Sequence, residues 1–194
     1  MSKLFHGGNL VSRFVRERDA NAAVEFAFIV PLMLTLFFGM VEFSSGYAAQ
    51  RKVAIATRNL SDLVSQSSAV TDTDLDNYNS TSRAIMYPFP LSPDYEARVT
   101  ELYIDPTTRI GQVRWSKGWG AGKPPLTGTM AVPTALQVGG TYVIFGEVSY
   151  KYVPAVGYVM AKTGVPLSDK SYMRPRLINC VFYSPEIVCP KKLN

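Results

Sequence analysis

The chain has few of the side chains that most active sites need. Its 194 residues include one histidine, His6, and two cysteines, Cys180 and Cys189. These three residues are too few and too far apart for a cysteine–histidine zinc site. A histidine-dependent catalytic triad is excluded from the C-terminal part, because the only histidine lies near the N-terminus. The sequence therefore predicts a non-enzymatic protein without catalytic residues, a metal site or a cofactor.

Dense basic runs are also missing, although the formal net charge is +5. The basic residues are scattered, with Arg13, Arg16 and Arg18 near the start and Lys191 and Lys192 near the end. No stretch has the charge density of a nucleic-acid-binding arm. We therefore expect no nucleic-acid partner, and we expect the arginine-rich start to lie at an anionic membrane surface.

Charge is absent altogether from residues 26–41, between Glu25 and Glu42. As a helix this run is about 24 Å long, slightly short of a hydrocarbon core about 30 Å thick, and its apolar flanks supply the missing length. Pro31 lies inside the run, and membrane helices tolerate proline with a kink. The sequence predicts one transmembrane helix that contacts the lipid bilayer. A buried helix of a globular core is the alternative.

An amphipathic pattern continues beyond the apolar run. One apolar stripe recurs at helical spacing, formed by Ala49, Val53, Ala56, Leu60, Leu63 and Val64. The pattern divides the chain into a basic leader (1–20), a transmembrane and stem helix (21–68) and an α+β domain (69–194). We expect this domain to lie outside the cytoplasm, because of its size and its cysteine pair, with the N-terminus in the cytoplasm.

The domain should contain a small antiparallel sheet. Residues 71–88 are polar and predict a loop with a short helix. Strand-like runs bounded by proline and glycine occupy residues 97–104, 110–115, 141–152 and 177–183. Residues 117–128 should form a loop, and residues 155–162 a short helical insert. The fold class is thus α+β, with a long N-terminal helix followed by a small antiparallel sheet.

Three smaller patterns in the domain have both a structural and a functional reading. Cys180 and Cys189 predict a disulfide, since even pairs outside the cytosol are usually oxidised, and two buried thiols are the alternative. The alternating residues Asp72, Asp74 and Asp76 lack the glycine and closing glutamate of a calcium loop, so a helix cap is the stronger reading. Trp115 and Trp119 are expected to pack rather than to form a contact surface.

The most informative segment is RERDANAAVEFAFIVP, residues 16–31. It resembles the N-terminal signature of type IV-like prepilins and, more closely, of TadE-like minor pseudopilins of tight-adherence (Tad) pili. The resemblance implies that a prepilin peptidase cuts after Ala20, so that Asn21 becomes the first residue and Glu25 the fifth. It also implies that Glu25, Phe26 and Pro31 serve in assembly. The family normally has glycine where this chain has Ala20.

The resemblance implies a minor pseudopilin that assists assembly or priming of a pilus at the bacterial inner membrane. The implied partners are the prepilin peptidase, the major pilin, a second TadE-like protein, other pilin-like subunits and the inner-membrane secretion platform. The α-amine created at Asn21 would pair with Glu25 of a neighbouring subunit, a charge-assisted contact that is strong at low dielectric. The alternative is a permanently anchored periplasmic binding module or adhesin, whose leader is not removed.

Overall fold

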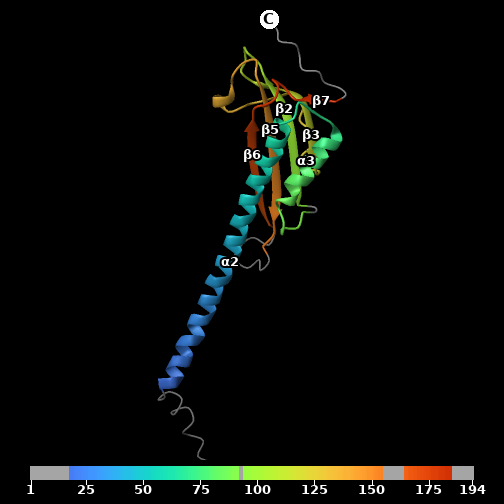
Figure 1. The fold of residues 1–194 in the computed structure, drawn as a ribbon. Helices are drawn as coiled ribbons and strands as arrows, with labels where there is room; N and C mark the ends of the chain where they lie inside the picture. Colours follow the sequence, from blue (N-terminus) through green and yellow to red (C-terminus); the bar gives the residue numbers. More distant parts are fainter. Residues whose placement is uncertain (1–17, 92–93, 155–163, 185–194) are drawn as a thin grey trace, which may run out of the picture.

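A single long helix organises the molecule. The computed structural model describes residues 18–91, 94–154 and 164–184. Helix α2 (Arg18–Ser65) runs alongside the sheet with its C-terminal part and projects away from it with its N-terminal part (Figure 1). We call residues 22–41 the exposed half of α2 and residues 42–65 the stem. The α+β fold predicted from the sequence is confirmed.

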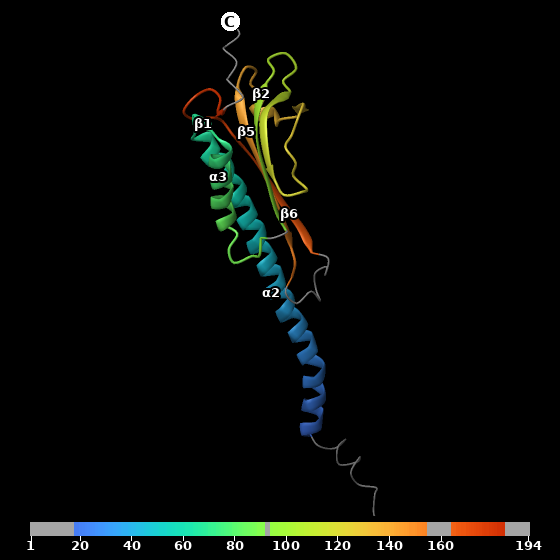
Figure 2. The ribbon, with the colours of Figure 1, turned by 90° about the vertical axis from the view of Figure 1, so that its right-hand side faces the viewer.

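An antiparallel five-stranded sheet packs against the stem. Its strand order is β4-β3-β2-β5-β6, so the longest strands, β2 and β5, lie at its centre. Helix α3 lies on the same face of the sheet as the stem (Figure 2). The elements after α2 are β1 (Ala69–Val70), α3 (Asp72–Ala84), β2 (Tyr95–Ile104), β3 (Gly111–Trp119), β4 (Thr129–Met130), a 3₁₀ turn (Thr134–Leu136), β5 (Tyr142–Tyr152), β6 (Val165–Met173) and β7 (Phe182–Tyr183).

The predicted apolar stripe of the stem forms the main core. Ala49, Val53, Ala56, Leu60 and Val64 are fully buried, and they belong to one cluster with the helix-facing side chains of β2 and β5. Their spacing of three and four residues keeps one face of the helix on the sheet throughout the stem. The stem is therefore part of the domain's core and not only a stalk.

A glycine allows the stem to approach the sheet closely. A Cβ atom added at Gly146 of β5 would lie 2.0 Å from Ser61 Oγ and 3.4 Å from the Thr57 carbonyl oxygen. Both side chains are fully buried, and their hydroxyls donate to carbonyls one turn earlier in α2, at 2.8 Å for Thr57 and 3.0 Å for Ser61. The hydroxyls on this face of α2 therefore have their hydrogen-bond acceptors within the helix, so that the face can pack against the backbone of the strand.

Helix α3 is fixed by the three aspartates that alternate in the sequence. Thr71 and Asp74 form a reciprocal capping box at its start. Asp72 accepts hydrogen bonds from Lys117 and from the Tyr183 hydroxyl, and Asp76 accepts one from Trp119 Nε1 at 2.7 Å. The cap reading is confirmed, and each of the three carboxylates has a partner within the chain.

The opposite face of the sheet carries a smaller core and a buried charge cluster. Leu102, Ile104, Val132, Val143 and Phe145 form the core. Beside it, Glu147 is buried and contacts Arg98 Nη2 at 2.6 Å and Lys123 Nζ at 2.8 Å. Burial alone would raise the pKa of Glu147, but Lys123 and Arg98 outweigh it and hold this pKa below its usual range.

The C-terminal segment returns to the start of the domain. Strand β7 pairs in parallel with β1, and Trp115 Nε1 donates to the Val181 carbonyl at 2.9 Å. The Val181 amide donates to the carboxylate of Glu101, which is buried, at 2.6 Å. Burial raises the pKa of Glu101 to about 8, against the opposing effect of the hydrogen bonds from Val181 and Trp115. The ring of Trp115 stacks on Tyr183, so its predicted packing role is confirmed.

The observed strands agree in part with those predicted from the sequence. The predicted strands at 97–104, 110–115 and 141–152 are confirmed as β2, β3 and β5. The prediction of a strand over 177–183 is wrong except at Phe182–Tyr183, and β6 was missed. The predicted loop at 117–128 begins later, since β3 continues to Trp119. The predicted helical insert at 155–162 lies outside the described residues.

Replacing Gly146 by alanine should destabilise the seam between α2 and β5. The added methyl group overlaps Ser61 Oγ, and overpacking of this kind costs about 1–3 kcal/mol. Urea denaturation of the full chain in detergent, followed by tryptophan fluorescence, would measure the loss. The same change in a Ser61→Ala background should cost less, because the overlapping oxygen is gone. Equal costs in both backgrounds would contradict the proposed contact.

Glu101 should make domain stability depend on pH. Its carboxyl has a pKa of about 8 in the folded chain, against an ordinary glutamate pKa of 4.5. Between these values the folded state holds a proton that the unfolded state has lost. The free energy of unfolding should therefore fall as pH rises, by about 1.4 kcal/mol per pH unit for a single group. Glu101→Gln should remove this slope, whereas Glu96→Gln on the other face of β2 should retain it. Denaturation at pH 5, 6 and 7 would compare the three proteins.

Candidate membrane anchor and assembly site

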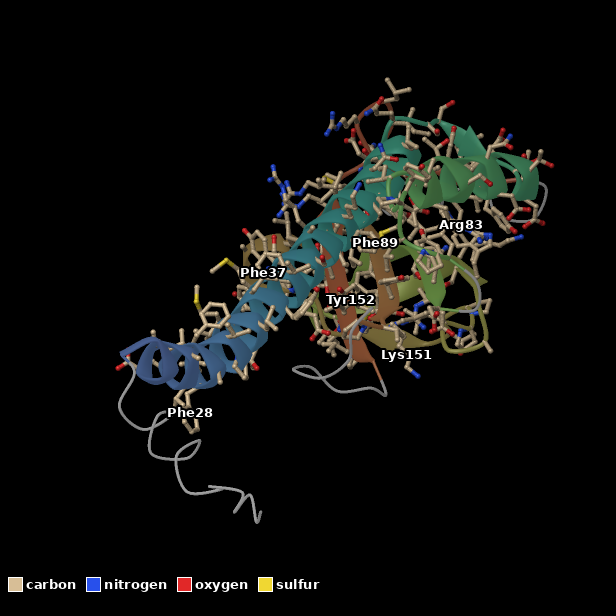
Figure 3. All side chains as sticks on the ribbon, turned by 90° about the horizontal axis from the view of Figure 1, so that it is seen from below. Phe28, Phe37, Arg83, Phe89, Lys151 and Tyr152 are labelled. Atoms are coloured by element: carbon tan, nitrogen blue, oxygen red, sulfur yellow. The ribbon has the colours of Figure 1, made fainter. Side chains whose placement is uncertain are left out.

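The exposed half of α2 presents apolar side chains on every side. Almost all of residues 22–41 are exposed, although phenylalanine, leucine, isoleucine and methionine predominate. Phe28 and Phe37 are 78% and 61% exposed, and Phe28 projects outward from the helix (Figure 3). Apolar exposure on this scale marks a membrane or protein contact surface. Within the described residues, α2 is the one helix long and apolar enough to span a membrane, which makes it a candidate anchor.

Pro31 interrupts the hydrogen bonding of the exposed half without ending the helix. Its nitrogen cannot donate to the carbonyl of Ala27, one turn earlier. Downstream, the Thr35 hydroxyl donates to the Pro31 carbonyl at 2.8 Å, so this polar side chain is satisfied inside the apolar run. The helix continues through both residues. An unpaired carbonyl in hydrocarbon is costly and is usually compensated by a neighbouring helix or by local adjustment.

The predicted assembly residues lie close to one end of this surface. Glu25 and Phe26 are both exposed, Glu25 one turn beyond Asn21. Ala20 and Asn21 lie within the helical backbone, and their side chains are outside the described part. An ionised carboxylate on a lipid-facing helix surface is expensive and normally has a partner. The geometry thus leaves Glu25 able to pair with a cation on another chain.

Glu42 marks the other end of the exposed half. It is 2% exposed, whereas Val41 and Phe43 on either side of it are 46% and 71% exposed. Sequence reasoning used Glu42 only as the limit of the charge-free run and missed its burial. The signal was available, since a carboxylate directly after such a run stands where the helix meets the domain.

Comparison with protein families gives a match to the same helix. Residues 21–60 match the family model described as TadE-like protein. Over these residues the helix is similar to TadE-like proteins. The match starts at Asn21, directly after the predicted leader, and ends at Leu60 in the buried stripe of the stem. No curated protein and no solved structure matches the chain.

The TadE-like helix has two halves with different surroundings. Its exposed half has no covering element among the described residues, and its stem is covered by β5, β6 and α3. The sheet domain lies beyond the matched residues. The match therefore concerns the part of the molecule that carries the anchor and the predicted assembly residues.

The domain carries no comparable cluster of reactive groups in its described part. No group of three or more His, Cys, Asp or Glu side chains that could hold a metal occurs among the described residues. Cys180 is 2% exposed, next to Val181 in the segment held by Glu101. Cys189 lies outside the described residues, so the pairing of Cys180 with Cys189 stays a prediction.

Proposed function

We propose that this protein is a non-enzymatic minor pseudopilin that takes part in assembly or priming of a Tad-type pilus. The observation that carries the proposal is the TadE-like helix itself. One half is apolar and exposed on all sides, and the other half forms the core of a small sheet domain. A helix of this kind can pack against similar helices in the membrane while its domain remains in water. Catalysis has no part in this role.

The proposed topology follows from the two halves of the helix. The exposed half crosses the inner membrane, the N-terminus lies in the cytoplasm, and the domain lies in the periplasm. Partners would contact the exposed half, because its side chains otherwise contact only lipid. These partners are the major pilin, a second TadE-like protein and the inner-membrane secretion platform. Before assembly, a prepilin peptidase would cut between Ala20 and Asn21.

Glu25 would set the register between neighbouring helices. Cleavage creates an α-amine at Asn21, and a protonated amine is the natural partner for a carboxylate in hydrocarbon. Exposure of Glu25 supports this role, since the side chain can be reached by another subunit. The same exposure keeps Glu25 out of the domain core, so its role can be tested without unfolding the protein.

Glu25→Ala should abolish association with other pilin-like helices and should leave the domain folded. Insertion should be unchanged or slightly better, because a charge is removed from the span. Glu25→Asp should be partly defective, because its shorter side chain reaches the amine less well. Co-purification of partners and counts of surface pili would measure both variants. Ile110→Ala, at an exposed site of the domain, serves as the matched control.

Normal complexes and normal piliation in the Glu25→Ala protein would contradict the assembly role. A Glu25 that is simply solvated at the membrane surface gives this result for both substitutions. Loss of the protein from membranes in the alanine variant would instead show that Glu25 acts in insertion.

Processing after Ala20 gives a separate prediction. N-terminal sequencing of the membrane-extracted protein should start Asn-Ala-Ala-Val. Ala20→Gly should accelerate cleavage, since glycine is the residue normally found at this position of the family, and Ala20→Phe should stop it. A chain that keeps Met1 in piliated cells would favour the permanently anchored binding module or adhesin, a reading supported by alanine at position 20.

A further inference from the structure

An apolar cleft lies where α2 first meets the sheet. Its volume is about 150 Å³. One wall comes from the helix and the other from the adjoining ends of β5 and β6, and all its lining residues are aromatic, aliphatic or glycine. They are Phe43, Gly46, Tyr47, Tyr152, Val165 and Leu167. The adjoining ends of β5 and β6 that form its sheet wall belong to the end of the sheet nearer the exposed half of α2 (Figures 1 and 2).

The position of the cleft along the helix places it at the membrane surface. Phe43 comes two residues after the last residue of the charge-free run, and Tyr47 lies one turn further on. At 1.5 Å per residue, both lie within about 10 Å of the end of that run. Because the run is about 24 Å long, a hydrocarbon core about 30 Å thick extends about 3 Å past it at each end, and the interfacial layer occupies about the next 5–7 Å. The helix wall of the cleft therefore occupies this layer when the exposed half spans the membrane.

The sheet wall of the cleft reaches the same level and has the composition of a membrane interface. Val153, which directly follows β5, is 52% exposed, and Lys151 is exposed at the end of that strand. Lys151 and Tyr152 are visible at the end of the sheet when the molecule is viewed from below (Figure 3). Aromatic side chains concentrate at headgroup level, and lysine can reach the phosphates there.

We infer that this end of the domain lies in the headgroup layer, and that the cleft binds the part of one phospholipid acyl chain nearest the headgroup. We call this end of the domain the rim; it consists of Phe43, Tyr47, residues 151–153 and Val165. The inference rests on the membrane span in the proposed function. Phe43, which lines the cleft, is 71% exposed and lies two residues from the exposed half of α2, and a volume of about 150 Å³ is too small for a folded partner. A lipid in the cleft would fill the space between the helix and the sheet and would hold the domain at a fixed angle to the membrane plane.

Depth-dependent fluorescence quenching tests this placement. The full chain is reconstituted in phosphatidylcholine vesicles whose acyl chains are either unmodified or brominated. Single tryptophans are added as Tyr152→Trp in the cleft and Val153→Trp on the rim. The unmodified chain gives the background from Trp115 and Trp119. Phe37→Trp in the span is the positive control. Ile110→Trp is the negative control, because Ile110 lies on the turn between β2 and β3, at the end of the sheet opposite the cleft.

Brominated lipid should quench the fluorescence of the introduced tryptophan most strongly in Phe37→Trp and clearly in Tyr152→Trp and Val153→Trp. It should not quench the fluorescence of the introduced tryptophan in Ile110→Trp. Quenching at position 37 without quenching at 152 and 153 would overturn the inference and leave the membrane span intact. Quenching at 153 alone would overturn the lipid in the cleft. Absence of quenching at position 37 would overturn the span, and the inference with it.

Discussion

The close contact between the α2 stem and β5 is the constraint on which the rest of the structure depends. Gly146 presents strand backbone to Thr57 and Ser61, whose hydroxyls are already bonded within the helix. Above and below this contact, the apolar stripe of the stem fills the inner face of the sheet. The domain therefore has no complete core without the helix, and the same helix carries the TadE-like span. The candidate membrane anchor and the core of the domain are therefore parts of one element.

The features predicted from sequence were those with a strong local pattern. The charge-free run, the stem stripe and the alternating strand at residues 142–152 each repeat over many residues, and each was recognised. A helix cap around Asp72 and Asp74 was also predicted, because the capping residues lie within three residues of one another in the chain. Where backbone structure is decided by neighbours in sequence, the pattern suffices.

The features that were missed depend on distant partners. Strand β6 contains Pro166, Asp169 and Lys170, and its position comes from pairing with β5 at the sheet edge. Residues 177–181 looked strand-like because they are apolar, yet Val181 is held by Glu101 and Trp115 rather than by a strand partner. Burial of Glu42 likewise depends on where the domain meets the helix. None of these contacts produces a periodic pattern in the sequence.

The exposed half and the stem form one uninterrupted helix, with no loop between them. A pull or a twist applied to α2 beyond Pro31 is therefore passed directly to the sheet, because the helix contains no further proline and no loop between Pro31 and Ser65. The stem lies along β5 and β6, so such a load acts as shear on the interface between the helix and these strands. It strains all the contacts of this interface at once instead of breaking them one after another. The part of α2 after Pro31 and the sheet therefore behave as one stiff unit under such a load.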